Sequence, residues 1–165
     1  MDEKLICPPN QYYPTTETTP LVYLGGNDDV DRKWETKAIE LIRAAKPDVF
    51  IANPHEYLAC DVDLAADIGW RIYHQRMASV NGIVMFWMGK VYGDDGETRH
   101  ELAEWITHLK YRKIHQPEKP LKLVVGIDPE YYDAEYLIYR LYDDLPDFSI
   151  HNTLEVTIAA VVELL

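Results

Sequence analysis

The sequence contains little cysteine. Cys7 and Cys60 are the only two among 165 residues, and they form no CxxC pair or other spacing typical of a zinc site. This usage predicts two thiols in a reducing compartment and excludes a disulfide framework. We expect no metal ion.

Basic residues are also scarce. The chain has 16 Lys and Arg residues against 28 Asp and Glu residues, which gives a formal net charge of −12. Proteins that bind a nucleic-acid polymer neutralise its phosphates with Lys and Arg. The acidic balance therefore argues against such a partner.

Long apolar runs are absent as well. No run approaches the roughly 20 residues that span a bilayer. The first residues, MDEKLICPPNQYYP, lack the basic region and the apolar core of a signal peptide. We therefore predict a cytoplasmic protein with no membrane partner. The 165 residues, 47% of them hydrophobic, suffice for one domain with a real core.

The most informative stretch that is present runs from Gly82 to Trp105. Its apolar run Ile83–Met88 is typical of a central parallel strand that is covered on both faces. An acidic glycine loop and then a helix follow it. Asp95 and Glu101 thus lie near a helix N-terminus, whose partial positive charge keeps carboxylates ionised.

Strand and helix patterns alternate five times along the chain, which predicts a parallel sheet with right-handed crossovers. The expected strands are 21–25, 49–52, 83–88, 121–127 and 148–150, and the expected helices are about 31–45, 64–79, 98–109, 131–143 and 153 to the end. We predict an α/β fold, flavodoxin-like or Rossmann-like, with a doubly wound five-stranded sheet in the order 2-1-3-4-5. Residues 20–165 form this domain. Residues 1–19, rich in proline, form an extended arm that could contact a partner subunit.

In this order the first and third strands flank the topological switch point, so the loops after Gly25 and Met88 should face each other. Gly25, Gly26 and Asn27 follow the first strand, where glycines would let backbone N–H groups approach a ligand. A lone Gly-Gly pair is a weak signal, and a plain turn is the alternative.

Several motifs together resemble one known family. In order along the chain they are VYLGGN, Trp34, ANPHE, IVMFWM, GETRHELAEW and LVVGIDPEYY. From about Val22 to the end, the chain resembles the nucleoside 2-deoxyribosyltransferase-like family. The resemblance implies a flavodoxin-like fold and cleavage of the N-glycosidic bond of a nucleoside or nucleoside monophosphate. The sugar passes to another base or to water.

The resemblance also implies roles for particular residues. Glu101 takes the position of the nucleophilic glutamate that attacks the anomeric carbon, and Asp95 that of the aspartate that helps to protonate the departing base. Tyr23 and Gly25 match residues that line the sugar site, and Asn27, His74, Met88 and Thr98 complete the predicted substrate-binding set. Such a reaction uses two carboxylates and needs no cofactor. The family habit of sharing active sites between subunits implies a homo-oligomer.

Three positions depart from the family pattern. Ala103 stands where a glycine is usual, Gly82 where an aspartate is common, and His74 where a carboxylate often holds the sugar hydroxyls. These departures motivate an alternative function, a nucleotide-binding sensor or accessory subunit that has lost turnover. A flavodoxin-like signalling domain ranks last, because neither a phosphate cradle nor a phosphorylation site appears.

The candidate residues also have purely structural interpretations. Thr98 and Glu101 have the spacing of a helix capping box. Asp95 could form an Asx turn or cap the helix, and Arg99 could pair with Asp94 or Glu97. His74 could be a partly buried polar residue without a catalytic role.

Overall fold

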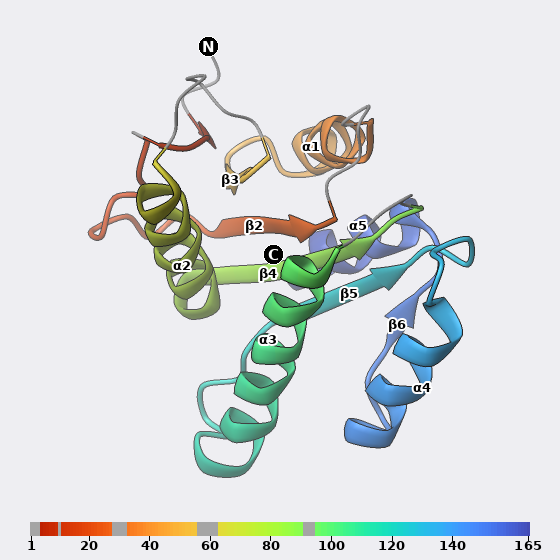
Figure 1. Ribbon diagram of the computed structural model, residues 1–165. Helices are drawn as coiled ribbons and strands as arrows, with labels where there is room; N and C mark the ends of the chain where they lie inside the picture. Colours follow the sequence, from red (N-terminus) through yellow and green to blue (C-terminus); the bar gives the residue numbers. More distant parts are fainter. Residues whose placement is uncertain (1–3, 10, 28–32, 56–62, 91–94) are drawn as a thin grey trace.

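The computed structural model describes residues 4–9, 11–27, 33–55, 63–90 and 95–165 (Figure 1). Within these residues the chain forms one parallel sheet with helices on both faces, which is a doubly wound α/β architecture of the flavodoxin-like type. The strands are β1 (Leu5–Ile6), β2 (Leu21–Gly26), β3 (Phe50–Ala52), β4 (Gly82–Met88), β5 (Leu123–Ile127) and β6 (Ile150–His151). The helices are α1 (Lys33–Ala45), α2 (Leu64–Asn81), α3 (Gly96–His115), α4 (Ala134–Asp144) and α5 (Leu154–Leu164).

The strand order is β1-β3-β2-β4-β5-β6, with every neighbouring pair parallel. The five predicted strands keep their predicted relative order, but the count of five was wrong. Leu5 and Ile6, in the segment predicted to be an arm, pair with Ile51 and Ala52 and add a sixth strand at the edge. Two residues are too few for a periodic pattern to reveal a strand.

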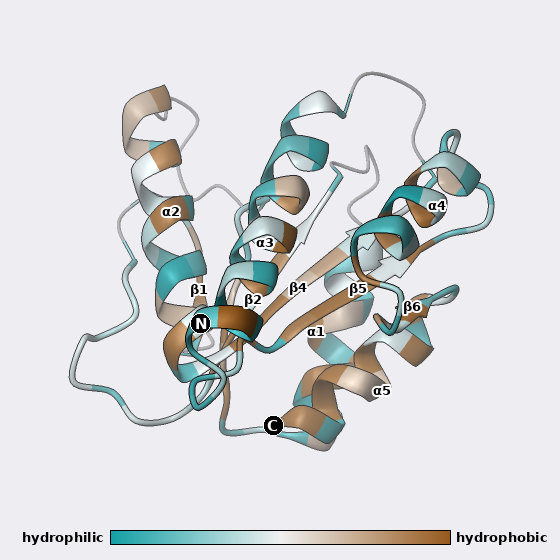
Figure 2. Cartoon of the chain, turned by 90° about the horizontal axis from the view of Figure 1, so that it is seen from below, coloured by the Kyte–Doolittle hydropathy of each residue, from teal (hydrophilic) through white to brown (hydrophobic). Residues whose placement is uncertain are grey.

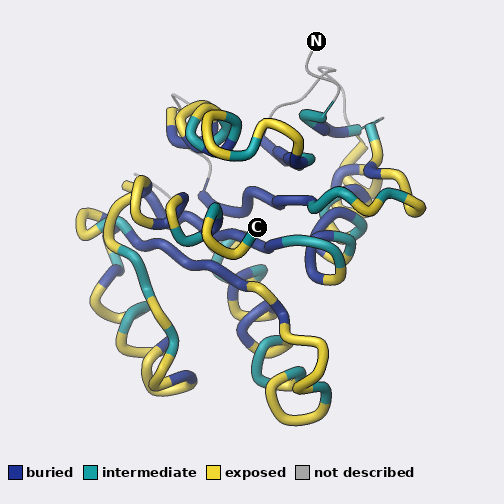
Figure 3. The backbone as a smooth tube through the Cα atoms, turned by 180° about the vertical axis from the view of Figure 1, so that it is seen from behind, coloured by how far each residue is buried: buried dark blue, intermediate teal, exposed yellow. Residues whose placement is uncertain are grey.

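The apolar run of β4 is buried from Ile83 to Met88, as a strand covered on both faces requires (Figure 3). One core layer lies under α2, α3 and α4 and includes Tyr23, Phe86 and Trp105. The opposite layer lies under α1 and α5 and includes Trp34 and Trp87 (Figure 2). The alternation of β4 side chains between these two layers fixes which helix faces which side of the sheet.

Gly82 begins β4 directly after α2. A Cβ atom at this position would lie 1.8 Å from the carbonyl oxygen of Leu21, so no larger residue fits there without moving the backbone of β2. The close approach of β2 and β4 thus explains why a glycine stands at position 82.

The N-terminal segment packs onto the domain that it precedes. Tyr13 is fully buried, and its hydroxyl donates to the carbonyl oxygen of Thr19 at 2.7 Å. The Trp70 indole N–H donates to the carbonyl oxygen of Gln11 at 2.7 Å. The segment therefore packs along α2 from Trp70 to Asn81. No helix in the described ranges is long and apolar enough to cross a membrane.

Candidate active site

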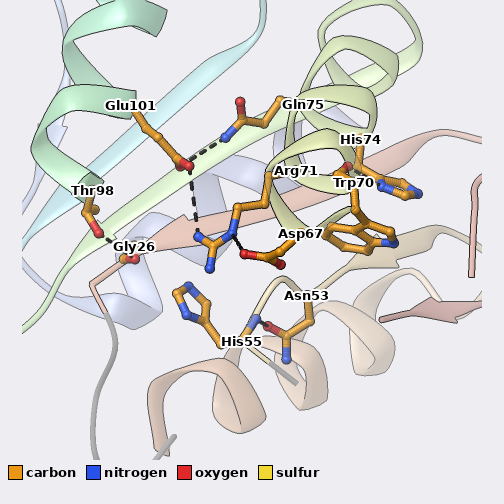
Figure 4. Close-up of polar contacts among 10 residues, drawn as sticks. All are labelled: Gly26, Asn53, His55, Asp67, Trp70, Arg71, His74, Gln75, Thr98 and Glu101. Carbon is orange, nitrogen blue, oxygen red and sulfur yellow. Dashed lines mark hydrogen bonds and ion pairs between the residues drawn. The ribbon is translucent and has the colours of Figure 1, made fainter. Parts of the chain in front are cut away.

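Glu101 lies on the side of α3 that faces α2, beyond the carboxyl ends of β2 and β3 (Figure 4). The Gln75 side-chain N–H donates to Glu101 Oε2 at 3.0 Å, and Arg71 Nη1 lies 3.9 Å from Oε1. The Glu101 side chain is 18% exposed. The carboxylate is thus held by two α2 residues and keeps a limited opening to solvent.

Burial raises the pKa of Glu101 to about 6. The positive charge of Arg71 and the hydrogen bond from Gln75 act in the opposite direction, and the negative charge of Glu97 adds to the rise. At pH 7 a carboxyl group with this pKa is about nine-tenths ionised. Glu101 can therefore act as a nucleophile at neutral pH.

The capping-box interpretation of Thr98 and Glu101 is wrong. The helix begins at Gly96 with Asp95 at the N-cap, which places Thr98 inside the first turn. The Thr98 hydroxyl donates to the carbonyl oxygen of Gly26 at 3.0 Å. This bond ties the start of α3 to the end of β2 and so positions Glu101 at the edge of the sheet.

Gln75 has a fixed orientation. It is 6% exposed, and its side-chain oxygen accepts a hydrogen bond from the Trp105 indole N–H at 3.1 Å. An indole N–H can only donate, so the amide must present its own N–H to Glu101. Trp105, one turn beyond Glu101 on α3, therefore orients the group that orients the carboxylate.

Asp67 and Arg71 form the second part of the site. Arg71 Nε lies 3.0 Å from Asp67 Oδ2, and Asp67 is 7% exposed. Asp67 Oδ1 is buried and, among the described residues, has no hydrogen-bond partner. A buried carboxylate oxygen without a partner is costly, and it provides an acceptor for a ligand hydroxyl.

Sequence reasoning missed Asp67, Arg71 and the role of Gln75. Asp67, Arg71 and Gln75 are spaced four residues apart, so they share one face of α2. Three hydrogen-bonding side chains in line on a helix that packs against a sheet were the signal that could have found them.

Tyr23, on β2, has a fully buried side chain. Its hydroxyl oxygen lies near the Gln75 side chain but makes no hydrogen bond of good geometry within the described part of the chain. Burial raises the pKa of Tyr23 well above its ordinary value, and the nearby negative charge of Glu101 raises it further. Tyr23 thus keeps its proton and offers an O–H donor beside the carboxylate.

Asp95 belongs to a separate network. It is 7% exposed, its Oδ1 accepts from the Tyr132 hydroxyl at 3.0 Å, and its Oδ2 accepts from the Tyr131 hydroxyl. Asp95 occupies the N-cap of α3 without a capping bond from its side chain. Across the described residues, Asp95 and Glu101 share no hydrogen-bond partner.

Arg99 joins the Asp95 network from inside α3. Its guanidinium lies 2.7 Å from the Asp133 carboxylate and donates to the Tyr132 hydroxyl at 2.9 Å. We predicted a partner at Asp94 or Glu97. Asp94 lies outside the described residues, and the partner observed here is Asp133.

His74 faces away from Glu101, toward the N-terminal segment (Figure 4). The Tyr13 backbone N–H donates to Nε2 at 3.1 Å, and Nδ1 lies 2.8 Å from the carbonyl oxygen of Trp70. Burial lowers the pKa of His74 to about 4, so the ring is neutral with its proton on Nδ1. The geometry fits the structural interpretation of this histidine.

Gly25 and Gly26 lie in β2, paired with Phe86 and Trp87, and do not form the turn considered above. A Cβ atom on Gly25 would lie 2.7 Å from the Phe86 ring. These glycines are therefore required by close packing between β2 and β4. Met88, at the end of β4, is fully buried in the same core layer as Tyr23.

Asn27 joins the ends of β2 and β4. Its side-chain amide donates to the carbonyl oxygen of Gly89 at 2.9 Å and accepts from the Gly89 N–H at 2.7 Å. It also borders a cavity of about 440 Å³ on the α1 and α5 side of the sheet. Asn53 caps the next loop by accepting from the backbone N–H of His55 at 3.1 Å.

No group of three or more His, Cys, Asp or Glu side chains in the described ranges is arranged to hold a metal ion. Cys7 is a buried thiol, and Cys60 lies outside those ranges. A scan against models of protein families found no match for this chain, and a search of curated proteins found none either.

Proposed function

We propose that this protein cleaves the N-glycosidic bond of a nucleoside, deoxynucleoside or nucleoside monophosphate, with Glu101 as the nucleophile. The observation that carries the proposal is the Glu101 carboxylate itself, which is mostly buried, oriented by Gln75 and shifted to a pKa of about 6. A carboxylate that only caps a helix or lies on the surface requires neither burial nor a hydrogen bond that fixes its orientation.

Each carboxylate oxygen has a distinct place in the reaction. Oε2 accepts from Gln75 at 3.0 Å, whereas the one described partner of Oε1 is Arg71 at 3.9 Å. We assign the attack on the anomeric carbon to Oε1. The bond to the base breaks as the bond from Oε1 forms, and the base leaves with a proton. Water or a second base then attacks the anomeric carbon from the face that the first base has left, opposite Glu101, and gives up its proton as the bond to Oε1 breaks. The two inversions give net retention of configuration.

The remaining residues would hold the sugar and the base. Asp67 Oδ1 and the Tyr23 hydroxyl, both buried and without a partner within the described part of the chain, supply an acceptor and a donor for sugar hydroxyls. The family pattern often has a carboxylate at the position of His74 that holds the sugar hydroxyls. We assign this role to Asp67, which lies on the same helix α2. Asp95 would deliver the proton to the base, and the bond from Tyr131 to Asp95 would position it.

The three departures from the family pattern do not touch Glu101. Gly82 fits the close contact of β2 with β4, and His74 holds the N-terminal segment. Ala103 is exposed and borders a cavity between α3 and α4. Two of the three observations that motivated a sensor without turnover, Gly82 and His74, therefore have structural causes, which supports the enzyme over the sensor.

We also propose that the protein acts in the cytoplasm as a homo-oligomer on a small-molecule substrate. Neither a nucleic-acid polymer nor a membrane is part of the proposal.

The test is chromatographic. Pure protein, Glu101→Gln and Glu104→Gln are incubated with a panel of ribonucleosides, deoxyribonucleosides and their monophosphates, with and without a free acceptor base. Glu104 is one turn away on α3 with a side chain 61% exposed, which makes it a matched control. We expect free base from the parent and from Glu104→Gln, and none from Glu101→Gln.

A new nucleoside that forms only with acceptor would identify a transferase. Base release that survives Glu101→Gln would overturn the role of Glu101. No turnover across the panel, together with thermal stabilisation by one of its members, would overturn the enzyme in favour of the sensor.

A further inference from the structure

The chain has four tryptophan residues, and the indole N–H groups of three of them have an acceptor within the chain. Trp34 donates to Asn27, Trp70 to Gln11 and Trp105 to Gln75. The fourth, Trp87, is 5% exposed, and its indole N–H has no acceptor among the residues that the structure describes. Buried indole N–H groups usually find a hydrogen-bond partner. The exception at Trp87 indicates that a molecule from outside the chain supplies the acceptor.

The N–H edge of the Trp87 ring faces a cavity. This is the cavity of about 440 Å³ that Asn27 borders, and both Trp87 and Gly89 line it. The indole nitrogen lies 2.8 Å from the point that a Cβ atom on Gly89 would occupy, so a larger residue there would cover the nitrogen. The glycine thus leaves the N–H open to the cavity. A volume of this size is within the usual range of small-molecule sites.

The cavity lies at the carboxyl ends of β2 and β4, beside α1 and α5 (Figure 1). Tyr23 and the helices α2 and α3, which carry the proposed active site, pack on the opposite face of the sheet. Ligands of doubly wound sheets bind beyond the carboxyl ends of the strands. The cavity therefore has a position typical of a ligand site, and it is separate from the site that contains Glu101.

Lysine side chains gather at this cavity in an otherwise acidic protein. Its lining includes three lysines and two acidic residues, namely Lys33, Lys37, Lys90, Asp128 and Glu155. The lining thus carries three positive charges against two negative ones, whereas the whole chain has a net charge of −12. Lys90 pairs with Glu130 at 2.6 Å, and both side chains are exposed, so this ion pair can open to admit another anion. The charge of the lining favours an anionic ligand.

A carboxylate of the chain already occupies part of this positive surface. Helix α5 begins at Leu154 after the N-cap Thr153, and the backbone N–H groups of a first helical turn carry partial positive charge. The Glu155 carboxylate accepts a hydrogen bond from Lys37 and one from its own backbone N–H, and both lower its pKa. The Lys37 and Glu155 side chains are 51% and 54% exposed, so their ion pair contributes little to stability. The anionic group of a ligand can therefore displace Glu155.

We propose that this cavity binds a small phosphate monoester, whose phosphate accepts from the Trp87 indole N–H and is neutralised by Lys37 and Lys90. A phosphate monoester carries a charge of about −1.5 to −2 near pH 7, and lysine is a usual partner of phosphate. The organic part of the ligand contacts Trp34 and Leu154, which supply apolar surface in the same lining. The proposal does not depend on the proposed reaction, because none of these residues holds Glu101.

The first test is a titration with phenyl phosphate, followed through the indole N–H resonances in ¹⁵N–¹H NMR spectra. Phenyl phosphate has no N-glycosidic bond, so its binding is independent of the proposed reaction. We expect the Trp87 resonance, assigned from its absence in Trp87→Phe, to move downfield and to saturate with a dissociation constant below about 1 mM. Inorganic phosphate, which lacks the apolar group, and benzoate, which carries a single charge, should each bind about tenfold more weakly or worse.

The second test compares the affinity of variants for phenyl phosphate by isothermal titration calorimetry. Trp87→Phe keeps an aromatic ring but removes the donor, so we expect its dissociation constant to rise about tenfold or more. Lys37→Gln should weaken binding about threefold or more, and Glu155→Gln should strengthen it about threefold or more because the competing carboxylate is gone. Lys37 and Glu155 are exposed, so these two variants keep the test decisive if Trp87→Phe does not fold.

Matched controls are Glu163→Gln, at an exposed position of α5, and Lys119→Gln, exposed between α3 and β5 at the opposite edge of the sheet. Both should bind phenyl phosphate as the parent does. Glu101→Gln should also bind it with the parent's affinity, so failure of this proposal and failure of the proposed reaction are distinguishable.

Four results would overturn the proposal. They are a Trp87 resonance that does not move at about 10 mM phenyl phosphate, benzoate that binds as tightly as phenyl phosphate, a Trp87→Phe or Glu155→Gln protein with the affinity of the parent, and loss of binding in Glu101→Gln. The last result would place the ligand in the site on the other face of the sheet.

Discussion

Replacement of Glu101 by glutamine should stabilise the fold while it removes the proposed activity. The pKa of Glu101 is raised to about 6 from the usual 4.5, which means that the folded protein favours the protonated carboxyl group. One unit of pKa corresponds to about 1.4 kcal/mol, so the ionised form costs the fold about 2 kcal/mol. Glutamine is neutral at every pH and does not carry this cost.

The sign of the pH dependence follows from the direction of the shift. Below about pH 4.5 Glu101 is protonated in both folded and unfolded chains, so the cost is absent. As the pH rises through about 6, the folded protein must give up a proton that the unfolded chain has already lost, so the cost becomes complete. The shift to about 6 is already net of the attraction to Arg71, so we expect Glu101→Gln to be more stable than the parent by about 2 kcal/mol at pH 7.5.

The assay is urea unfolding of the parent and of Glu101→Gln at pH 5 and pH 7.5, followed by circular dichroism. The stability difference between the two proteins should grow with pH. Glu104→Gln, at an exposed position of the same helix, should change stability by less than about 0.5 kcal/mol at either pH. A Glu101→Gln protein that is less stable than its parent at pH 7.5, or a difference that does not change with pH, would refute the reasoning.

Three other changes have defined outcomes. The neutral, buried ring of His74 has a pKa of about 4 against the usual 6.5, so its stabilisation of about 3 kcal/mol is complete above pH 6.5 and is lost as the pH falls toward 4. Between pH 6.5 and pH 4 the melting temperature of the parent should therefore fall more than that of His74→Gln. Melting temperatures that fall equally with pH in the two proteins would contradict the assignment. Gly82→Ala places a Cβ atom 1.8 Å from a backbone carbonyl oxygen and should lower the free energy of unfolding by about 3 kcal/mol or more, measured in urea; a change under about 1 kcal/mol would show that the strands can move apart. Gln75→Leu removes the hydrogen bond that lowers the pKa of Glu101, so the acidic limb of the profile of kcat/KM against pH should move to higher pH and kcat should fall about tenfold. An acidic limb at the same pH as in the parent would show that Gln75 does not act on Glu101 in the reaction.

The fold could be predicted in outline because each central element has a strong periodic or apolar pattern. The run from Ile83 to Met88 is buried along its whole length, as its composition requires. Helix ends were less accurate: α3 runs from Gly96 to His115, beyond the predicted 98–109, since its polar last turns have no apolar pattern to mark them. The edge strand β1 escaped prediction because a parallel pairing with Ile51 depends on distant residues.

Only the part of the candidate site that lies on α3 could be predicted from the sequence. Glu101 was predicted from the motif that follows β4 and stays a prediction, and Thr98 lies one turn before it on α3, bonded to β2. Asp67, Arg71 and Gln75 were not found, because their significance depends on how α2 packs against α3 and no local pattern states it. His74 was assigned to the substrate from a position in a pattern, whereas its contacts depend on Tyr13, which is 61 residues away.

The N-terminal strand β1 imposes an order on folding. During synthesis Leu5 leaves the ribosome well before Ile51, its partner in the sheet, and Tyr13 leaves 61 residues ahead of His74. A contact between distant segments must pay for closure of the intervening loop, so β1 and Tyr13 cannot dock until β3 and α2 exist. Leu5, Ile6 and Tyr13 therefore reach their native places only after the later segments β3 and α2 have formed, and until then the outer edge of β3 is open to pairing with another polypeptide.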